Sequence, residues 1–147
     1  MGFLGRLRAQ RSPSRACPCP TLRLGGEELI YAVGESHYQP ALLGACDARP
    51  GEPVTHDCTA VLVPEPTNPH DPNAVMVWVD GNRVAYLSRS DALAYGPTVR
   101  AASRSGHLIA CAARISGRGE SARTANLGIF LLLALPPEAL SEVERLQ

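Results

Sequence analysis

The residues Ala74–Leu87, AVMVWVDGNRVAYL, decide the fold class. In their first half, valines at every second position alternate with larger side chains, which is the two-residue period of a half-buried strand. An Asp-Gly-Asn turn sequence follows at 80–82, and a second apolar segment leads from it to Leu87. We therefore expect a β-hairpin with strands over 74–80 and 83–87.

Four further strands are expected on either side of this hairpin, at 28–35, 54–63, 107–116 and 127–135. Six short strands with hairpin connections are typical of a small barrel rather than of a layered α/β sheet. The predicted fold is mainly β: a small OB-like six-stranded β-barrel, closed or partly open, with one or two inserted short helices and a C-terminal helix.

The helices are indicated by caps and prolines. A short helix is expected within 40–45, and Ser88 with Asp91 as its N3 acid predicts the start of a longer one. We expect Pro97 to bend or interrupt that helix. Pro-Pro-Glu at 136–138 begins a short amphipathic segment that runs to the end of the sequence.

Three regions follow from these patterns. Residues 1–26 mix Arg, Pro, Ser and Gly with few large apolar side chains, and we expect a flexible basic arm there. The barrel domain is expected over 27–136 and the C-terminal amphipathic helix over 137–147.

Charge is unevenly distributed in a chain whose formal net charge is zero. All 14 basic residues are arginine; seven of them lie in 81–127, whereas 27–80 has nine acidic residues and only Arg49. This asymmetry indicates either a polyanion-binding face or a solvated surface. The absence of lysine excludes a phosphate-binding GxxxxGK[ST] loop.

The cysteines and apolar segments predict neither a metal site nor a membrane span. Cys17-Pro18-Cys19 lacks a second ligand pair at zinc spacing, so no metal or other cofactor is expected. The apolar segment 127–135 is much shorter than the roughly 20 residues of a membrane-spanning helix, and no signal peptide is apparent. We therefore expect a cytoplasmic protein without a membrane partner.

The segment that precedes the hairpin, EPTNPHDPNAV at 65–75, is rigid and polar. Pro64 directly before it and three prolines within it, at 66, 69 and 72, restrict the backbone, so the polar side chains lose little further entropy on binding a ligand. Asn68 and Asp71 are also ordinary turn residues, and Asn73 can cap the bend or start the next strand. The spacing leaves two roles open, a self-satisfied turn and a prepared binding loop.

Three segments together resemble the HIRAN domain, a module found at the N-terminus of certain DNA-translocating ATPases and also as a free-standing bacterial protein. They are VGESHYQ at 33–39, LVPEPTNPHDPNAV at 62–75 and VAYLSR at 84–89, in the family's order. The resemblance covers roughly residues 28–135.

The resemblance implies an OB-like barrel that binds single-stranded DNA, with capture of a free 3′ end in the best understood members. It places Asn68 and Asp71 at the terminal sugar, where a carboxylate can accept a hydrogen bond from the 3′ hydroxyl. Tyr38 and Tyr86 would stack on the last bases. The predicted nucleic-acid surface also includes Asn73, His37, Arg83 and Arg89, and the arginines between 83 and 123 would follow the phosphates.

The sequence departs from the family at two places. Ser36, His37 and Tyr38 stand where end-binding members have a basic residue and two aromatic residues, so one phosphate contact and one ring are expected to be missing. His37 is compatible with base stacking or with capping the bend. Ala85 stands where the family usually has glycine.

Two alternatives belong to other functional classes. His56-Asp57 and His70-Asp71 could bind a metal ion for phosphoester hydrolysis. Alternatively, the barrel could be an adaptor that docks on a helicase or a nuclease through the basic arm or the C-terminal helix. We expect a module without catalytic residues. In other proteins that carry this domain the hydrolase activity belongs to ATPase motors, and this chain has no ATPase motif.

Overall fold

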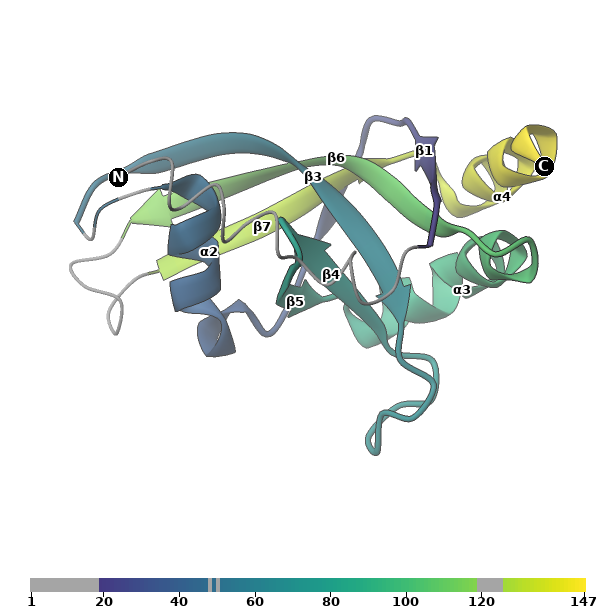
Figure 1. Ribbon diagram of the computed structural model, residues 1–147, viewed down its shortest axis with the longest axis horizontal. Helices are drawn as coiled ribbons and strands as arrows, with labels where there is room; N and C mark the ends of the chain where they lie inside the picture. Colours follow the sequence, from purple (N-terminus) through teal and green to yellow (C-terminus); the bar gives the residue numbers. More distant parts are fainter. Residues whose placement is uncertain (1–18, 48, 50, 119–125) are drawn as a thin grey trace.

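The computed structural model describes residues 19–47, 49, 51–118 and 126–147. Its centre is a curved sheet with the strand order β2-β7-β6-β3-β4-β5, and β1 pairs in addition with β6 (Figure 1). In chain order the elements are β1 (Thr21–Leu24), β2 (Glu28–Tyr31), the 3-10 helix η2 (Glu35–His37), α2 (Gln39–Cys46), β3 (Val54–Pro64), β4 (Val75–Val79), β5 (Asn82–Tyr86), α3 (Arg89–Arg104), β6 (Leu108–Arg118), β7 (Asn126–Leu133) and α4 (Pro136–Leu146).

The β4–β5 hairpin forms where the alternation of the sequence predicts it. Its two-residue turn has positive φ at both central positions, 50° at Asp80 and 79° at Gly81. Two positive φ values are the mark of a type I′ turn, whose twist suits neighbouring antiparallel strands. The alternating valines Val75, Val77 and Val79 are all buried, so one face of the hairpin belongs to the core.

The sheet is mainly antiparallel and partly open, as predicted. β2 and β5 form the two ends of the strand order and do not pair along their length. An isolated bridge nevertheless joins Val33, two residues after β2, to Tyr86 at the end of β5: Val33 N donates to Tyr86 O at 2.8 Å, and Tyr86 N donates to Val33 O at 2.9 Å. This bridge brings the first bend of the chain next to the end of β5, where two of the predicted site residues lie.

Three expectations need correction. The sheet has seven strands instead of six, because Thr21–Leu24 forms β1 and pairs in parallel with β6. Those residues fall within the segment 1–26 that we expected to be a flexible arm; residues 1–18 lie outside the described residues. The strand expected over 28–35 ends at Tyr31, and Gly34, with φ 79°, leads into η2 instead.

The longest helix, α3, begins at the predicted cap. Ser88 Oγ accepts a hydrogen bond from Asp91 N at 3.1 Å, which satisfies one of the free N–H groups of the first turn. The helix continues through Pro97 to Arg104, so the expected interruption is not found. Helices α3 and α4 lie together at one end of the sheet and α2 at the other (Figure 1).

The core lies inside the curve of the sheet and beneath the helices. Burial of each large aliphatic side chain contributes about 1.5–3 kcal/mol, so these residues supply most of the stabilising free energy. The largest that are almost completely buried are Leu24, Leu42, Leu62, Ile109, Ile115, Leu131 and Leu133. Within the described residues, no helix has the length and hydropathy needed to cross a membrane.

Candidate nucleic-acid interface

The loop between β3 and β4, residues 65–74, protrudes from the sheet (Figure 1). Backbone hydrogen bonds close it at its base and at its tip: Glu65 N donates to Ala74 O at 2.9 Å, and Asn68 N donates to Glu65 O at 3.0 Å. A third backbone hydrogen bond runs from Ala74 N to Asp71 O at 3.1 Å, and side chains supply further contacts.

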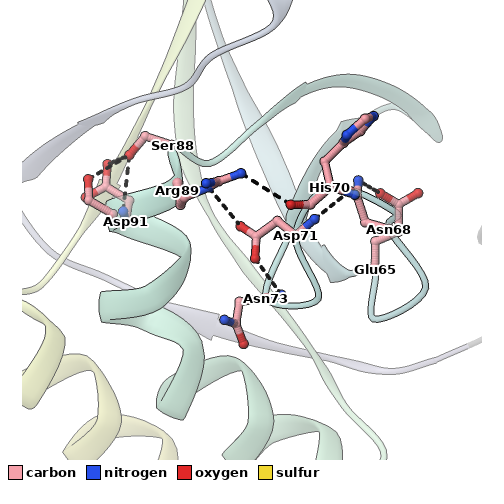
Figure 2. Close-up of polar contacts among 9 residues, drawn as sticks. Glu65, Asn68, His70, Asp71, Asn73, Ser88, Arg89 and Asp91 are labelled. Atoms are coloured by element: carbon pink, nitrogen blue, oxygen red, sulfur yellow. Dashed lines mark hydrogen bonds and ion pairs between the residues drawn. The ribbon is translucent and has the colours of Figure 1, made fainter.

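Both the oxygen and the nitrogen of the Asn68 side-chain amide form hydrogen bonds within this loop. Its Oδ1 atom accepts hydrogen bonds from the backbone N–H groups of His70 at 2.8 Å and Asp71 at 3.1 Å. Its Nδ2 atom donates to Glu65 Oε1 at 2.8 Å (Figure 2). Asn68 therefore fixes the shape of the loop.

The two carboxylate oxygens of Asp71 have different partners, one in the loop and one at the start of α3. Oδ1 accepts a hydrogen bond from Asn73 N at 2.9 Å, which is an Asx turn. Oδ2 faces the guanidinium of Arg89 at 3.9 Å from Nε, at the start of α3 (Figure 2). This distance is beyond the range of a hydrogen bond; the Arg89 side chain is 78% exposed and that of Asp71 17% exposed.

Arg89 joins the loop to α3 by a second contact. Its Nη2 atom donates to the backbone carbonyl of His70 at 3.2 Å, so the guanidinium spans the tip of the loop. Since Ser88 caps the same helix end, the position of the Arg89 backbone is well defined. The first residue of α3 thus places a cation beside the carboxylate of Asp71.

A second cluster lies next to the loop and contains Tyr38, Arg83, Tyr86 and Glu65. The guanidinium carbon of Arg83 lies 5.2 Å from the ring centroid of Tyr38 and 5.7 Å from that of Tyr86, within the range of cation–π contacts. Tyr86 Oη donates to Glu65 Oε1 at 2.8 Å, and Arg83 Nη1 donates to Tyr86 Oη at 3.0 Å. Arg83 and Glu65 also form an ion pair at 3.5 Å.

The protonation states in this cluster follow from its hydrogen bonds. Donation from Asn68, and then from Tyr86, holds the pKa of Glu65 below its ordinary value. Burial, and then the hydrogen bond to Glu65, raises the pKa of Tyr86. Both shifts favour an ionised carboxylate that accepts from a protonated phenol at neutral pH.

The loop, the end of β5 and the start of α3 enclose an open cavity of about 300 Å³. Polar atoms come from one wall and an aromatic ring from another, which suits a ligand with a polar end and a flat body. The cavity is lined by Asn68, His70, Asp71, Ala74, Tyr86, Leu87 and Arg89.

Most of the predicted site residues meet around this cavity. Asn68, Asp71, Tyr86 and Arg89 line it, and Arg83 and Tyr38 adjoin it through Tyr86. His37 lies beside Tyr38, with ring centroids 6.3 Å apart in an edge-to-face arrangement. Asn73 contributes its backbone N–H to Asp71.

The remaining arginines are dispersed over the molecule. Arg114 on β6 pairs with Asp57 on β3, with Nε 2.6 Å from Oδ1, and this pair lowers the pKa of Asp57. Arg100 and Arg104 belong to α3, and Arg118 ends β6, while Arg123 lies outside the described residues. Among the predicted phosphate contacts that the structure describes, Arg83 and Arg89 belong to the site.

Sequence reasoning missed Glu65, which contacts Asn68, Tyr86 and Arg83. Its place three residues before Asn68 is the local signal that could have indicated the first of these contacts. Two of the positions where the sequence departs from the HIRAN pattern do not line this cavity: Ser36 borders a second cavity of about 310 Å³, and Ala85 is completely buried in β5.

The alternative metal site gains no support from the geometry. His56 and Asp57 are neighbours on β3, and Asp57 is paired with Arg114. In the part of the chain that the structure describes, no three or more His, Cys, Asp or Glu side chains are grouped so as to hold a metal ion.

Comparison with known proteins yields one solved structure. The crystal structure of the HIRAN domain of human HLTF is 17% identical in sequence, with a TM-score of 0.41 over 82% of this chain and 88% of that chain. No family model matches the sequence, and no curated protein matches it. A similarity at this level transfers no function.

Proposed function

We propose that the chain is a non-catalytic module that binds single-stranded DNA and holds its free 3′ end in the cavity between the β3–β4 loop and α3. The observation that carries this proposal is the position of Asp71. Asp71 is a lining residue of an open cavity, its Oδ2 atom lies 3.9 Å from Arg89 Nε, and Tyr86 also lines the cavity. The resemblance of the motifs at 33–39, 62–75 and 84–89 to the HIRAN signature favours the same function.

Each wall of the cavity suits one part of a strand terminus. A carboxylate oxygen accepts a hydrogen bond from a 3′ hydroxyl, which an internal phosphodiester cannot donate. A tyrosine ring offers a face to the terminal base, and base stacking on aromatic rings is tolerant of sequence. The exposed guanidinium of Arg89 is placed for a phosphate oxygen of the last linkage.

The resemblance assigns Asn68 to the terminal sugar, but its hydrogen bonds favour an indirect role. Both lobes of its amide already have partners within the loop. We therefore assign contact with the hydroxyl to Asp71, and we assign to Asn68 the task of holding the Asp71 backbone in place.

The proposal is tested by fluorescence anisotropy with one 5′-labelled oligonucleotide that ends in a 3′ hydroxyl, a 3′ hydrogen or a 3′ phosphate. We expect the hydroxyl end to bind about tenfold more tightly than the 3′-hydrogen end, because a missing donor leaves a partly buried acceptor unpaired. The 3′-phosphate end should also bind less tightly, since it brings negative charge towards Asp71.

Equal affinity for the three ends would reject end capture and leave general strand binding. No binding of any of them at low salt would reject the nucleic-acid function itself, because phosphate contacts are strongest there.

A further inference from the structure

Arg83 lies beside the proposed site and contacts the rings of Tyr38 and Tyr86, which come from distant parts of the chain. Tyr38 immediately precedes α2, whereas Tyr86 ends β5. The bridge between Val33 and Tyr86 brings these segments together, and the guanidinium of Arg83 lies within 6 Å of both ring centroids. Arg83 is therefore a group that contacts both rings and relates Tyr38 to Tyr86.

One guanidinium nitrogen of Arg83, Nη1, makes its polar contacts with neighbouring side chains. Nη1 donates to Tyr86 Oη at 3.0 Å and lies 3.7 Å from Met76 Sδ. The same nitrogen is 3.5 Å from Glu65 Oε2, so the charge of Arg83 is balanced by an adjacent carboxylate. Its side chain is 38% exposed, compared with 78% for Arg89.

We infer that Arg83 is a positioning residue: it holds the rings of Tyr38 and Tyr86 as a prepared stacking platform for bases and does not bind phosphate. This inference deepens the proposed function and rests on it. It also changes the sequence-based prediction, which placed Arg83 among the phosphate contacts.

The physical reason is the cost of ordering side chains on binding. A side chain that becomes immobilised when a ligand binds loses conformational entropy, and a side chain that is already held in place avoids this cost. A guanidinium can lie against two rings and still donate hydrogen bonds from its edge, whereas an ammonium group is a point charge without a planar face. Through Glu65 and Asn68 the same contacts continue to the backbone of Asp71.

The first test needs no DNA. The chain has four tyrosines, so labelling with fluorotyrosine gives four ¹⁹F resonances. Arg83→Gln should shift the resonances of Tyr38 and Tyr86 and leave those of Tyr31 and Tyr95 in place. Arg83→Lys should resemble Arg83→Gln, because it keeps the charge and loses the planar group. Unchanged Tyr38 and Tyr86 resonances would overturn the inference.

The second test separates base contacts from phosphate contacts. For wild-type protein, replacing the terminal nucleotide by an abasic residue should weaken binding roughly tenfold, and Arg83→Gln should remove most of that difference. The slope of log K against log salt should stay the same in Arg83→Gln. In Arg89→Gln the slope should become less steep by about one, as for a lost phosphate contact.

Arg104→Gln serves as the matched control, because it lies in the last turn of α3, about 22 Å along the helix from Arg89. It should leave the abasic penalty unchanged. If Arg83→Gln lowers the salt slope by about one and keeps the abasic penalty, Arg83 is a phosphate contact and the inference is wrong. Wild-type protein that binds no oligonucleotide would instead reject the proposed function, while the fluorine spectra still decide whether Arg83 positions the rings.

Discussion

At the scale of single residues, the site depends on how the hydrogen bonds of a short loop are shared. The sequence predicts a polar, proline-rich loop with two possible roles, turn and binding site. In the structure Asn68 and one oxygen of Asp71 hold the turn, and the other oxygen of Asp71 faces Arg89; both Asp71 and Arg89 line the cavity. The spacing of these residues in the sequence could not predict the different partners of the two oxygens, because one of those partners is Arg89, whose position is set by α3.

Glu65 illustrates what local sequence cannot predict. Its contact with Asn68 is local, but its contacts with Tyr86 and Arg83 require β5 to lie in the right register beside β4. The bulge between Val77 and Trp78 adjusts that register. Because bulges have no reliable local signature in the sequence, the second half of this cluster could not be predicted.

The charge of Glu65 should contribute stability that depends on pH. Its pKa is lowered in the folded protein, so the contribution is present well above about pH 4.3, the ordinary pKa of glutamate, and is lost as the pH falls through the lower folded-state value. We expect Glu65→Gln to reduce the Tm by a few degrees at pH 7. The difference from wild type should shrink towards pH 3.

Thermal unfolding followed by circular dichroism between pH 3 and pH 7 measures this difference. Glu144→Gln, an exposed position on α4, provides the control and should show little effect at any pH. A Tm difference for Glu65→Gln that stays constant down to pH 3 would show that the ionised carboxylate does not stabilise the fold.

At the scale of elements, strong alternation and turn chemistry were sufficient to locate the β4–β5 hairpin and the strand β3. β1 was not predicted, because four residues with one buried side chain carry little periodic signal. Its partner is β6, far along the chain, and a parallel pair has no turn to indicate it. For this reason the basic composition of residues 1–26 led to the prediction of a flexible arm, whereas Thr21–Leu24 forms a strand.

The connection from β1 to β2 depends on one glycine. Gly26 has φ 152°, and a Cβ atom there would lie 1.9 Å from the backbone nitrogen of Ala134. Gly26→Ala should therefore lower the Tm by roughly 5 °C or more, because the clash is with backbone and the conformation is strained. The measurement is thermal unfolding at neutral pH.

The adjacent glycine is a matched control. A Cβ atom at Gly25 would have nothing within 4 Å, so Gly25→Ala should change the Tm by about 2 °C or less. Similar Tm values for the two variants would contradict the close approach of this connection to the segment after β7.

At the scale of the whole molecule, the sheet brings together residues from three separated segments. Three segments meet at the site: the bend before α2, the β3–β4 loop, and the end of β5 with the start of α3. They meet because a bridge between Val33 and Tyr86 connects the two ends of the sheet. The order of these segments in the sequence is visible in the motifs, but their convergence depends on the curvature of the sheet.

Several arginines in the part of the chain that the structure describes are paired with acidic residues. Arg83 is paired with Glu65 and Arg89 with Asp71 at the site, and Arg114 is paired with Asp57 on β3. We therefore expect stacking and the hydroxyl contact, more than net charge, to supply the affinity of the proposed site.

The central claim is that Asp71 recognises a 3′ hydroxyl, and the most direct measurement combines a change in the protein with a change in the ligand. Asp71→Asn keeps Oδ1 for the backbone of Asn73 and replaces Oδ2 by an amide that donates hydrogen bonds. The dissociation constants of wild type and variant are compared for oligonucleotides that end in a 3′ hydroxyl or a 3′ hydrogen. We predict a preference of about tenfold for the hydroxyl in wild type and a ratio near one in Asp71→Asn, with similar affinities of both proteins for the 3′-hydrogen end. The same ratio in both proteins would contradict the claim.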